Sequence, residues 1–485
     1  MKRRNMGRRI ISIGVLILLL FQLAACENGK AKLSPKHPVT ITIWNYYNGS
    51  IAIAFDALVK EFNATVGAKE GIVIESRSMG SVTELEKEIL RCVGGEDGSM
   101  PLPNIFAAYA DIVHMMEKMN LFVDFNQYFN ESEQAQYLDS FMEEGRIGLS
   151  GELRIFPIAK ATEVLMLNET DWRPFADATG KTYDDLATME GLAQVAEAYY
   201  QWTDGQTEEP NGGKAFFGRD SLANFFIIAS RQFGTELFEV KGGAAEVQIN
   251  EAVFRKIWDC YYVPYISGCY YASGKFRSDD AKVGNILAYV GSTSSATYFP
   301  SEVTINSQQH EVSAKILPTP LFEGGESVIV QQGAGMVVTK GTPEQEHASA
   351  VFLKWFTDEK VNLGFSTSTG YMPVKKDALD HDRVLSWLNE GEHSIPKLVT
   401  ETLKVALQEI ETSEMYTSKA FSGGIEVRDI LELSLQELAN TDRAAVLAMM
   451  EMGITREFAV AEFNTEERFK EWVRTLEEAL IEVAV

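Results

Sequence analysis

The side chains that could perform chemistry in this sequence favour binding over catalysis. Six histidines are scattered along the chain, and His310-Glu311 lacks the second histidine of a zinc-binding HExxH motif. There is no GxSxG serine motif, and Gly333-Ala334-Gly335 lacks the third glycine of a dinucleotide-binding loop. Asp111 and Glu163 are the candidates for the opposed carboxylates that glycoside hydrolysis requires. We therefore expect no metal, no cofactor and no catalysis, and we keep a glycoside hydrolase as an alternative.

Aromatic and acidic side chains follow two of the expected strands. Trp44, Tyr46 and Tyr47 come directly after the first strand, whereas Tyr109 and Asp111 come at the end of the third. Flat amphipathic rings could stack on a sugar, or they could simply cover the core at the strand end. Asp111 could cap the following helix, accept a hydrogen bond from a ligand hydroxyl, or do both.

Alternating strand and helix patterns position these residues. The expected strands are 39–43, 72–74 and 105–109, and the expected helices are 51–62, 82–93 and 112–119. Such alternation predicts a doubly wound sheet, in which ligands bind off the carboxyl ends of the strands. The loops that carry Trp44 and Tyr109 would then converge on one cleft.

A second α/β pattern begins near Phe156. Its expected strands are 164–167 and 286–290, and its expected helices are 186–200, 222–233 and 253–262. Residues 315–319 and 328–339 are expected to be strands near a crossover back into the first lobe. The remainder, from 343 to 485, is mainly helical with acidic faces. The fold class that these patterns predict is α/β.

The first 25 residues have the order of an export signal. Five basic residues precede an apolar run from Ile10 to Leu20 that is too short for a comfortable membrane span of about 20 residues. Leu23-Ala24-Ala25-Cys26 resembles the bacterial lipoprotein box, which implies lipidation of Cys26 after cleavage. Residues 26–38 would then be a flexible tether. We expect an extracytoplasmic protein that is anchored to the cell membrane through this lipid alone.

Charge and cysteine content narrow the range of partners. The signal contains five of the 44 basic residues, so the remaining chain has 39 basic against 69 acidic residues, a net charge of −30. Nucleic acid and anionic membrane surfaces are poor partners for such a protein. Cys92, Cys260 and Cys269 lack metal-binding spacing. Cys260 and Cys269 could pair, or both could be buried thiols.

Taken together, these segments resemble the extracellular solute-binding proteins of family 1, which deliver carbohydrates and related solutes to ABC importers. The segments that carry the resemblance are 41–46, 103–111, 160–168, 318–320, 333–335, 347–356 and 370–374. Each is weak alone, but their order and spacing are specific. The resemblance implies a periplasmic-binding-protein fold of type II, with two α/β lobes that close on a ligand.

The resemblance also implies a division of the chain into lobes. We expect an N-terminal lobe of 39–157 plus 297–333 and a C-terminal lobe of 158–296 plus 334–485. The implied partners are a small sugar or polyol phosphate and the permease subunits of an importer. We expect the protein to be a monomer.

A closer likeness is to the glycerol-3-phosphate-binding branch of this family. In that branch a serine, a glycine amide, a tyrosine and an arginine hold the ligand, the arginine on its phosphate. By position these become Ser292, Gly333, Tyr371 and Arg428. An arginine fork matches a phosphate or carboxylate with paired donors. The alternative for Arg428 is a surface ion pair with Glu426 or Glu432 on its own helix.

The chain departs from this branch at two contacts. A tyrosine of the branch is replaced within Gly80-Ser81-Val82-Thr83, and a glutamate of the branch falls on Ala110. Asp111 and Glu84 are possible substitutes, and Lys160 could add a second cation. The bound solute could therefore differ from glycerol 3-phosphate.

The function that these observations favour is a binding lipoprotein with no catalytic activity. Its cleft would receive a neutral sugar or a phosphorylated polyol, and Arg428 would decide between them. The alternatives are a surface-attached glycoside hydrolase and a lipoprotein that scaffolds other envelope proteins.

Overall fold

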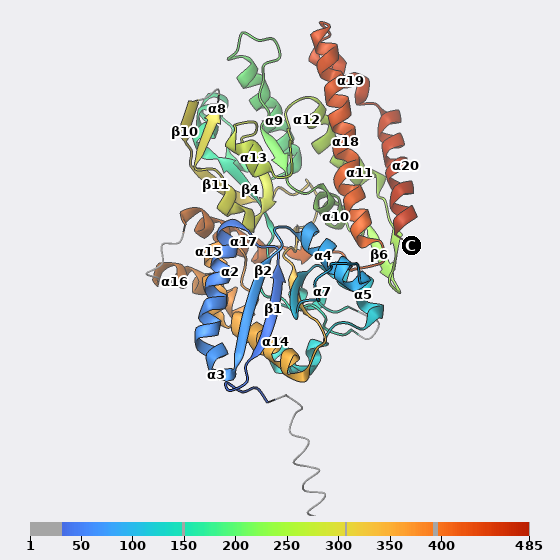
Figure 1. Cartoon of the computed structure of the whole chain (residues 1–485). Coiled ribbons are helices and arrows are strands. Elements are labelled where there is room, and N and C mark those ends of the chain that lie inside the picture. The colour runs from blue at the N-terminus through green and yellow to red at the C-terminus, as the bar shows by residue number, and fades with distance from the viewer. Residues whose placement is uncertain (1–31, 148–150, 306–307, 391–395, 485) are drawn as a thin grey trace, which may run out of the picture.

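The computed structural model describes residues 32–147, 151–305, 308–390 and 396–484. Figure 1 shows two lobes, each with helices around its own sheet. Strands β1 (Val39–Asn45) and β2 (Ile72–Ser78) lie in the lower lobe, and β4 (Glu163–Asn168) and β11 (Ala314–Pro318) lie in the upper one. The expected signal and Cys26 lie outside the described residues. Within the described part of the chain, no helix combines the length and the apolar character needed to cross a membrane.

The first lobe contains an open four-stranded sheet with the order β13-β3-β1-β2. Its strands are β1 (Val39–Asn45), β2 (Ile72–Ser78), β3 (Ile105–Ala108) and β13 (Gly335–Val338). The first three are parallel, and β13 joins β3 antiparallel. Its main helices are α2 (Gly49–Phe62), α4 (Val82–Gly94), α5 (Ala110–Met116), α7 (Asp139–Glu144), α14 (Pro343–Phe356), α15 (Glu359–Thr369) and α16 (His381–Glu390). Helix α17 (Lys397–Thr412) contributes to the core of this lobe and also packs against the sheet of the second lobe. The alternation expected for this region is confirmed.

The second lobe contains a four-stranded sheet with the order β11-β4-β8-β5. Its strands are β4 (Glu163–Asn168), β5 (Phe217–Arg219), β8 (Ala288–Ser292) and β11 (Ala314–Pro318). All six residues of β4 are buried, as an apolar strand covered on both faces requires. Its main helices are α8 (Glu169–Thr179), α9 (Met189–Asp204), α10 (Leu222–Gln232), α11 (Glu251–Ile257), α13 (Arg277–Lys282), α18 (Gly424–Glu451), α19 (Arg456–Phe463) and α20 (Glu466–Val483).

The cores of the two lobes divide the chain differently from the expected boundaries. The buried apolar residues of the first core come from 41–161 and 334–407, and those of the second come mainly from 165–322 and 421–484. The expected placement of 297–333 in the first lobe and of all of 334–485 in the second therefore disagrees with the cores. The cause is that β11 pairs with β4, whereas β13 pairs with β3.

Crossing segments connect the lobes. Ala161 and Gln332 form an antiparallel bridge, so two passages of the chain run side by side at the lobe boundary. A third passage contains β14 (Glu414–Tyr416), which pairs in parallel with β12 (Val328–Val330). Because the passages are paired, movement of one lobe about this boundary bends them together.

Three further details differ from or complete the expectations. Tyr109 is the N-cap of α5, and Asp111 lies in its first turn, so Asp111 does not cap the helix. The exposed hairpin of β6 (Phe238–Lys241) and β7 (Ala244–Val247) was not expected. Cys260 and Cys269 are both buried free thiols.

Candidate functional site

Loops from both lobes meet at the boundary between them. Tyr298, in the turn after β8, donates a 2.7 Å hydrogen bond to the side-chain oxygen of Asn48, which precedes α2. At the start of α18, Gly424 lies so close to Asp111 that an added Cβ would approach the carboxylate to 2.3 Å. A third contact is made by Gly370, which follows α15 of the first lobe. An added Cβ on Gly370 would approach the Thr293 carbonyl of the second lobe to 2.5 Å. The lobes are thus in direct contact around the predicted site.

Tyrosines of the first lobe line this boundary. The hydroxyl oxygens of Tyr46 and Tyr371 lie 3.4 Å apart, and the ring of Tyr47 meets that of Tyr371 at 6.1 Å between centroids. Burial raises the pKa of all three and also that of Tyr109. The four phenols therefore stay neutral, with hydroxyl groups able to donate or accept and ring faces able to cover apolar parts of a solute.

Trp44 lies elsewhere. It is 5% exposed within the first core, and its backbone pairs with Arg77 on one side and Phe106 on the other. A tryptophan in this position covers the core at the end of β1. Its burial opposes the expected stacking on a ligand, whereas Tyr46 and Asn48, which follow it in the same loop, reach the boundary.

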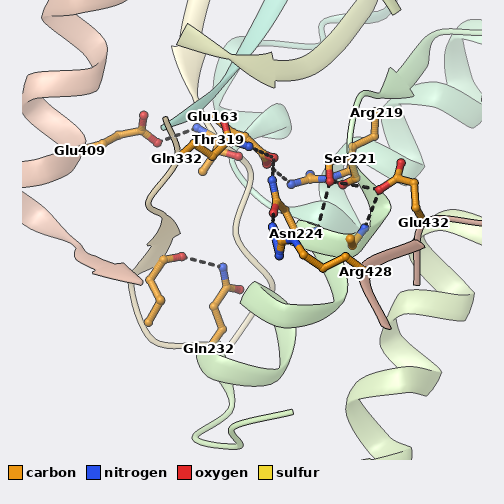
Figure 2. A network of polar contacts seen from close by, with 12 residues as sticks. Glu163, Arg219, Ser221, Asn224, Gln232, Thr319, Gln332, Glu409, Arg428 and Glu432 are labelled. Atoms are coloured by element: carbon orange, nitrogen blue, oxygen red, sulfur yellow. Dashed lines mark hydrogen bonds and ion pairs between the residues drawn. The ribbon is translucent and has the colours of Figure 1, made fainter. Parts of the chain in front are cut away.

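Arg428 belongs to a network of polar side chains in the second lobe (Figure 2). Its guanidinium donates a 2.8 Å hydrogen bond to Asn224 Oδ1. Asn224 Nδ2 in turn donates to Glu163 Oε1 at 2.9 Å, and Arg219 forms a buried ion pair with the other oxygen of Glu163. Gln332, from a crossing segment, also donates to Glu163 at 3.2 Å. The network joins α18 to β4 and to the lobe boundary.

Among the described residues of its own helix, α18, no acid forms an ion pair with Arg428. Glu432 accepts hydrogen bonds from the Ser221 hydroxyl and from the Ala223 amide at the start of α10 instead. Across the described residues, no carboxylate lies within 4.0 Å of the Arg428 guanidinium. The alternative of an ion pair with Glu426 or Glu432 is therefore not what the structure contains.

A carboxyl group and a phenol of the first lobe, those of Asp111 and Tyr109, lie near Arg428, and Glu86 lies near Asp111. Burial raises the pKa of Asp111, and the nearby charge of Arg428 opposes that shift. Burial also raises the pKa of Glu86, on α4, to about 7, and the charges of Asp111 and Asp429 add to the effect. Arg428 is also close enough to Tyr109 to lower the pKa of that phenol against the effect of burial. One cation thus lies among desolvated acids and phenols contributed by the opposite lobe.

Ser292 and Gly333 lie at the edges of this arrangement. The β4–β8 register places Ser292 beside Glu163, and its hydroxyl lies 3.0 Å from that of Ser294, which contacts Tyr371. Gly333 has a φ of +92°, and an added Cβ would approach the Ala159 carbonyl to 2.9 Å. Only glycine fits this close approach between the two crossing segments.

The ammonium group of Lys160 is buried and already paired within the protein. It is 2% exposed, and its ammonium lies 2.6 Å from Glu144 and 2.7 Å from the Gly333 carbonyl. A buried ion pair leaves no free charge for a ligand, which contradicts the expected second cation. The partner was hidden from sequence reasoning because Glu144 comes from α7, in a different segment.

Of the nine residues expected to bind a ligand, the structure brings seven to the lobe boundary: Tyr46, Tyr109, Asp111, Ser292, Gly333, Tyr371 and Arg428. Sequence reasoning missed Glu86 and Asn224. Asn224 did leave a signal, because it is an amide on the otherwise apolar first two turns of α10. Glu163, a candidate hydrolase carboxylate, is 3% exposed and paired with Arg219.

Residues 57–388 match a protein-family model described as bacterial extracellular solute-binding protein. This range is more than half of the 485 residues and includes parts of both lobes. No curated protein matches the chain.

Solved structures of binding proteins share the fold. UgpB from Mycobacterium tuberculosis in complex with glycerophosphocholine is 16% identical, with a TM-score of 0.64 over 92% of this chain and 99% of that one. The cyclic alpha-maltosyl-1,6-maltose binding protein from Arthrobacter globiformis is 17% identical, with a TM-score of 0.63 over 92% and 99%. The maltotriose-bound MalE domain from Bdellovibrio bacteriovorus is 14% identical, with a TM-score of 0.60 over 92% and 100%. The two-lobed fold is therefore confirmed.

Proposed function

This chain belongs to the bacterial extracellular solute-binding proteins, and we propose that it is the capture subunit of an ABC importer for a small polyhydroxylated solute with an anionic group. The family is extracytoplasmic and consists of binding proteins rather than enzymes, so the hydrolase alternative is set aside. The proposed solute class is a polyol phosphate or a phosphodiester of a polyol.

The observation that carries this proposal is the state of Arg428. Its guanidinium is half-buried, is held by the neutral amide of Asn224, and lies beside Tyr109 and Asp111 of the other lobe. A desolvated cation without an ion-pair partner is costly, and a phosphate that accepts its free donors would offset that cost. The phenols of Tyr46, Tyr109 and Tyr371 would bind the hydroxyl groups of the same solute.

Two of the structural relatives illustrate the choice of solute. UgpB is described with glycerophosphocholine and MalE with maltotriose, so the same fold accepts a phosphodiester or a neutral oligosaccharide. Arg428 favours the first class for this chain. The aromatic cluster alone would suit either class.

Capture would work through lobe closure. A solute that contacts Tyr46 and Arg428 at once binds the closed form better than the open form, and this difference in affinity shifts the population toward closure. The permease would then recognise the closed protein. We also propose that residues 1–25 are removed and that a lipid on Cys26 holds the protein at the outer face of the cell membrane.

The experiment is calorimetric titration of the purified chain with sn-glycerol 3-phosphate, glycerophosphocholine and maltotriose. We expect a phosphorylated probe to bind and Arg428→Ala to weaken that binding by about 10- to 150-fold, since charge-assisted bonds contribute about 1.5–3 kcal/mol. Arg474→Ala, which removes an exposed arginine paired with Glu478, is the matched control. Binding of maltotriose alone, or equal losses for charged and neutral probes, would overturn the anionic class.

A further inference from the structure

Asn224 is a buried polar residue with an unusual position. It lies in the first turn of α10, is 3% exposed, and is followed by the apolar run Phe225–Ala229, all of it buried. A buried amide costs free energy unless its donor and acceptor are both hydrogen-bonded. Asn224 satisfies both, with Glu163 on one side and Arg428 on the other.

The orientation of this amide is fixed by chemistry. Glu163 forms a buried ion pair with Arg219, and a carboxylate in such a pair can only accept hydrogen bonds. The NH₂ group of Asn224 must therefore face Glu163, and its carbonyl oxygen must face away from it. Figure 2 shows this carbonyl side meeting Arg428. The Glu163–Arg219 pair thus determines which end of Asn224 is presented to the arginine.

We propose that Asn224 is a positioning residue that fixes Arg428 for an anionic ligand without neutralising it. This inference rests on the proposed function and names a determinant of its specificity. An aspartate at the same place would hold the guanidinium equally well but would compensate its charge. A neutral acceptor orients the fork, adds no negative charge beside it, and leaves its remaining donors for the solute.

The same amide connects the ligand site to the lobe boundary. Glu163 receives one hydrogen bond from Asn224 and one from Gln332, whose backbone pairs with Ala161 between the crossing segments. The carboxylate of Glu163 therefore connects Arg428, through Asn224, to the segments that cross between the lobes. A ligand that displaces Arg428 would therefore also act on Asn224 and Glu163, which are hydrogen-bonded to a crossing segment.

The test compares Asn224→Ala and Asn224→Asp with the unchanged chain, by titration with sn-glycerol 3-phosphate. We expect Asn224→Ala to weaken binding at least tenfold, and Asn224→Asp to weaken it further at pH 8. Lowering the pH protonates the introduced carboxyl, which can then donate to Glu163 and accept from Arg428, so affinity should recover toward that of the unchanged chain. A purely structural role would not restore charge-dependent binding in this way.

A double-mutant cycle keeps the inference separate from folding defects. In the Arg428→Met background, Asn224→Ala should change the affinity by less than about twofold, because the group it positions is gone. Unchanged affinity in Asn224→Ala, or equal losses with and without Arg428, overturns the inference while leaving the proposed function intact.

If the chain binds no phosphorylated probe, the proposed anionic class is overturned. A second measurement then still tests the contact between Asn224 and Arg428. The unfolding equilibrium constants of Asn224→Ala, Arg428→Met and the double variant then decide the matter. A coupling of threefold or more supports the positioning contact. Additive effects overturn it.

Discussion

The phenol of Tyr298 in the second lobe donates a 2.7 Å hydrogen bond to the side-chain oxygen of Asn48 in the first, across the boundary that the site occupies. Tyr298 lies in the turn after β8, and Asn48 lies in the loop after β1. Both strands end at this boundary. The bond can exist only while the lobes face each other. It therefore stabilises the closed arrangement by its own free energy.

Tyr298→Phe should shift the protein toward the open form. A neutral hydrogen bond contributes about 0.5–1.5 kcal/mol, so the closed population and the ligand affinity should fall by about 2- to 13-fold. Small-angle scattering of the unliganded variant should give a larger radius of gyration. Tyr183→Phe is the control, because that hydroxyl bonds Glu169 inside the second lobe. An equal change in both variants would mean that the Tyr298 bond has no special relation to closure.

Glu86 should make the folded, closed chain sensitive to pH. Its pKa is raised from 4.5 to about 7, first by burial and then by Asp111 and Asp429. The folded state therefore binds a proton more tightly than the unfolded chain, and this contribution to stability is lost as the pH rises from about 4.5 to 7. Glu86→Gln removes the titrating group, so its melting temperature should fall less than that of the unchanged chain between pH 5 and pH 8.

The matched control for this measurement is Glu84→Gln, which changes an exposed residue two positions earlier on α4. It should leave the pH profile unchanged. Parallel profiles for Glu86→Gln and the unchanged chain would show that Glu86 does not titrate in this window.

Glu409 is a second buried acid, placed near a crossing segment. It accepts a 2.8 Å hydrogen bond from the Thr319 amide, and within the described chain its other oxygen has no hydrogen-bond partner. Burial raises its pKa well above the usual range, so the neutral form is favoured and the folded state loses stability as the pH rises past 4.5. Glu409→Gln should be tolerated, and its melting temperature relative to the unchanged chain should increase from pH 5 to pH 8. Glu409→Ala, which removes the acceptor, should be less stable than Glu409→Gln at both pH values.

The sequence predicted those parts of the fold that periodicity controls. The strands and helices of the first lobe follow local alternation, and β1 and α2 lie where their apolar spacing placed them. The hairpin of β6 and β7 was missed because its strands are only four residues long, and their apolar face consists of just Phe238, Val240, Ala245 and Val247. The lobe boundary was misplaced because β12 (Val328–Val330) and β13 (Gly335–Val338) are two short apolar strands with only residues 331–334 between them, so local pattern cannot tell where the chain passes from one sheet to the other.

The sequence predicted the location of a site residue only where the order of motifs along the chain determines that location. Arg428 and Tyr371 were identified from a resemblance that fixes their order in the chain, and both lie at the boundary. The states of Trp44 and Lys160 depend on partners in other segments. Trp44 is covered by its own lobe, and Lys160 meets Glu144, 16 positions earlier in the chain. Long-range pairing of this kind leaves no periodic signal.

The Lys160–Glu144 pair should matter for stability rather than for ligand charge. Lys160→Met leaves Glu144 buried without its cation, and breaking a buried pair in this way costs about 3–5 kcal/mol. Glu144 also accepts a hydrogen bond from Gln331, so the loss should loosen both crossing segments. Chemical denaturation should show the lower free energy of unfolding. Lys470→Met, which breaks an exposed pair with Glu466, should cost less than about 1 kcal/mol. If Lys160→Met instead kept its stability and lost affinity for sn-glycerol 3-phosphate alone, Lys160 would act as a ligand cation and its assignment to the structure would be wrong.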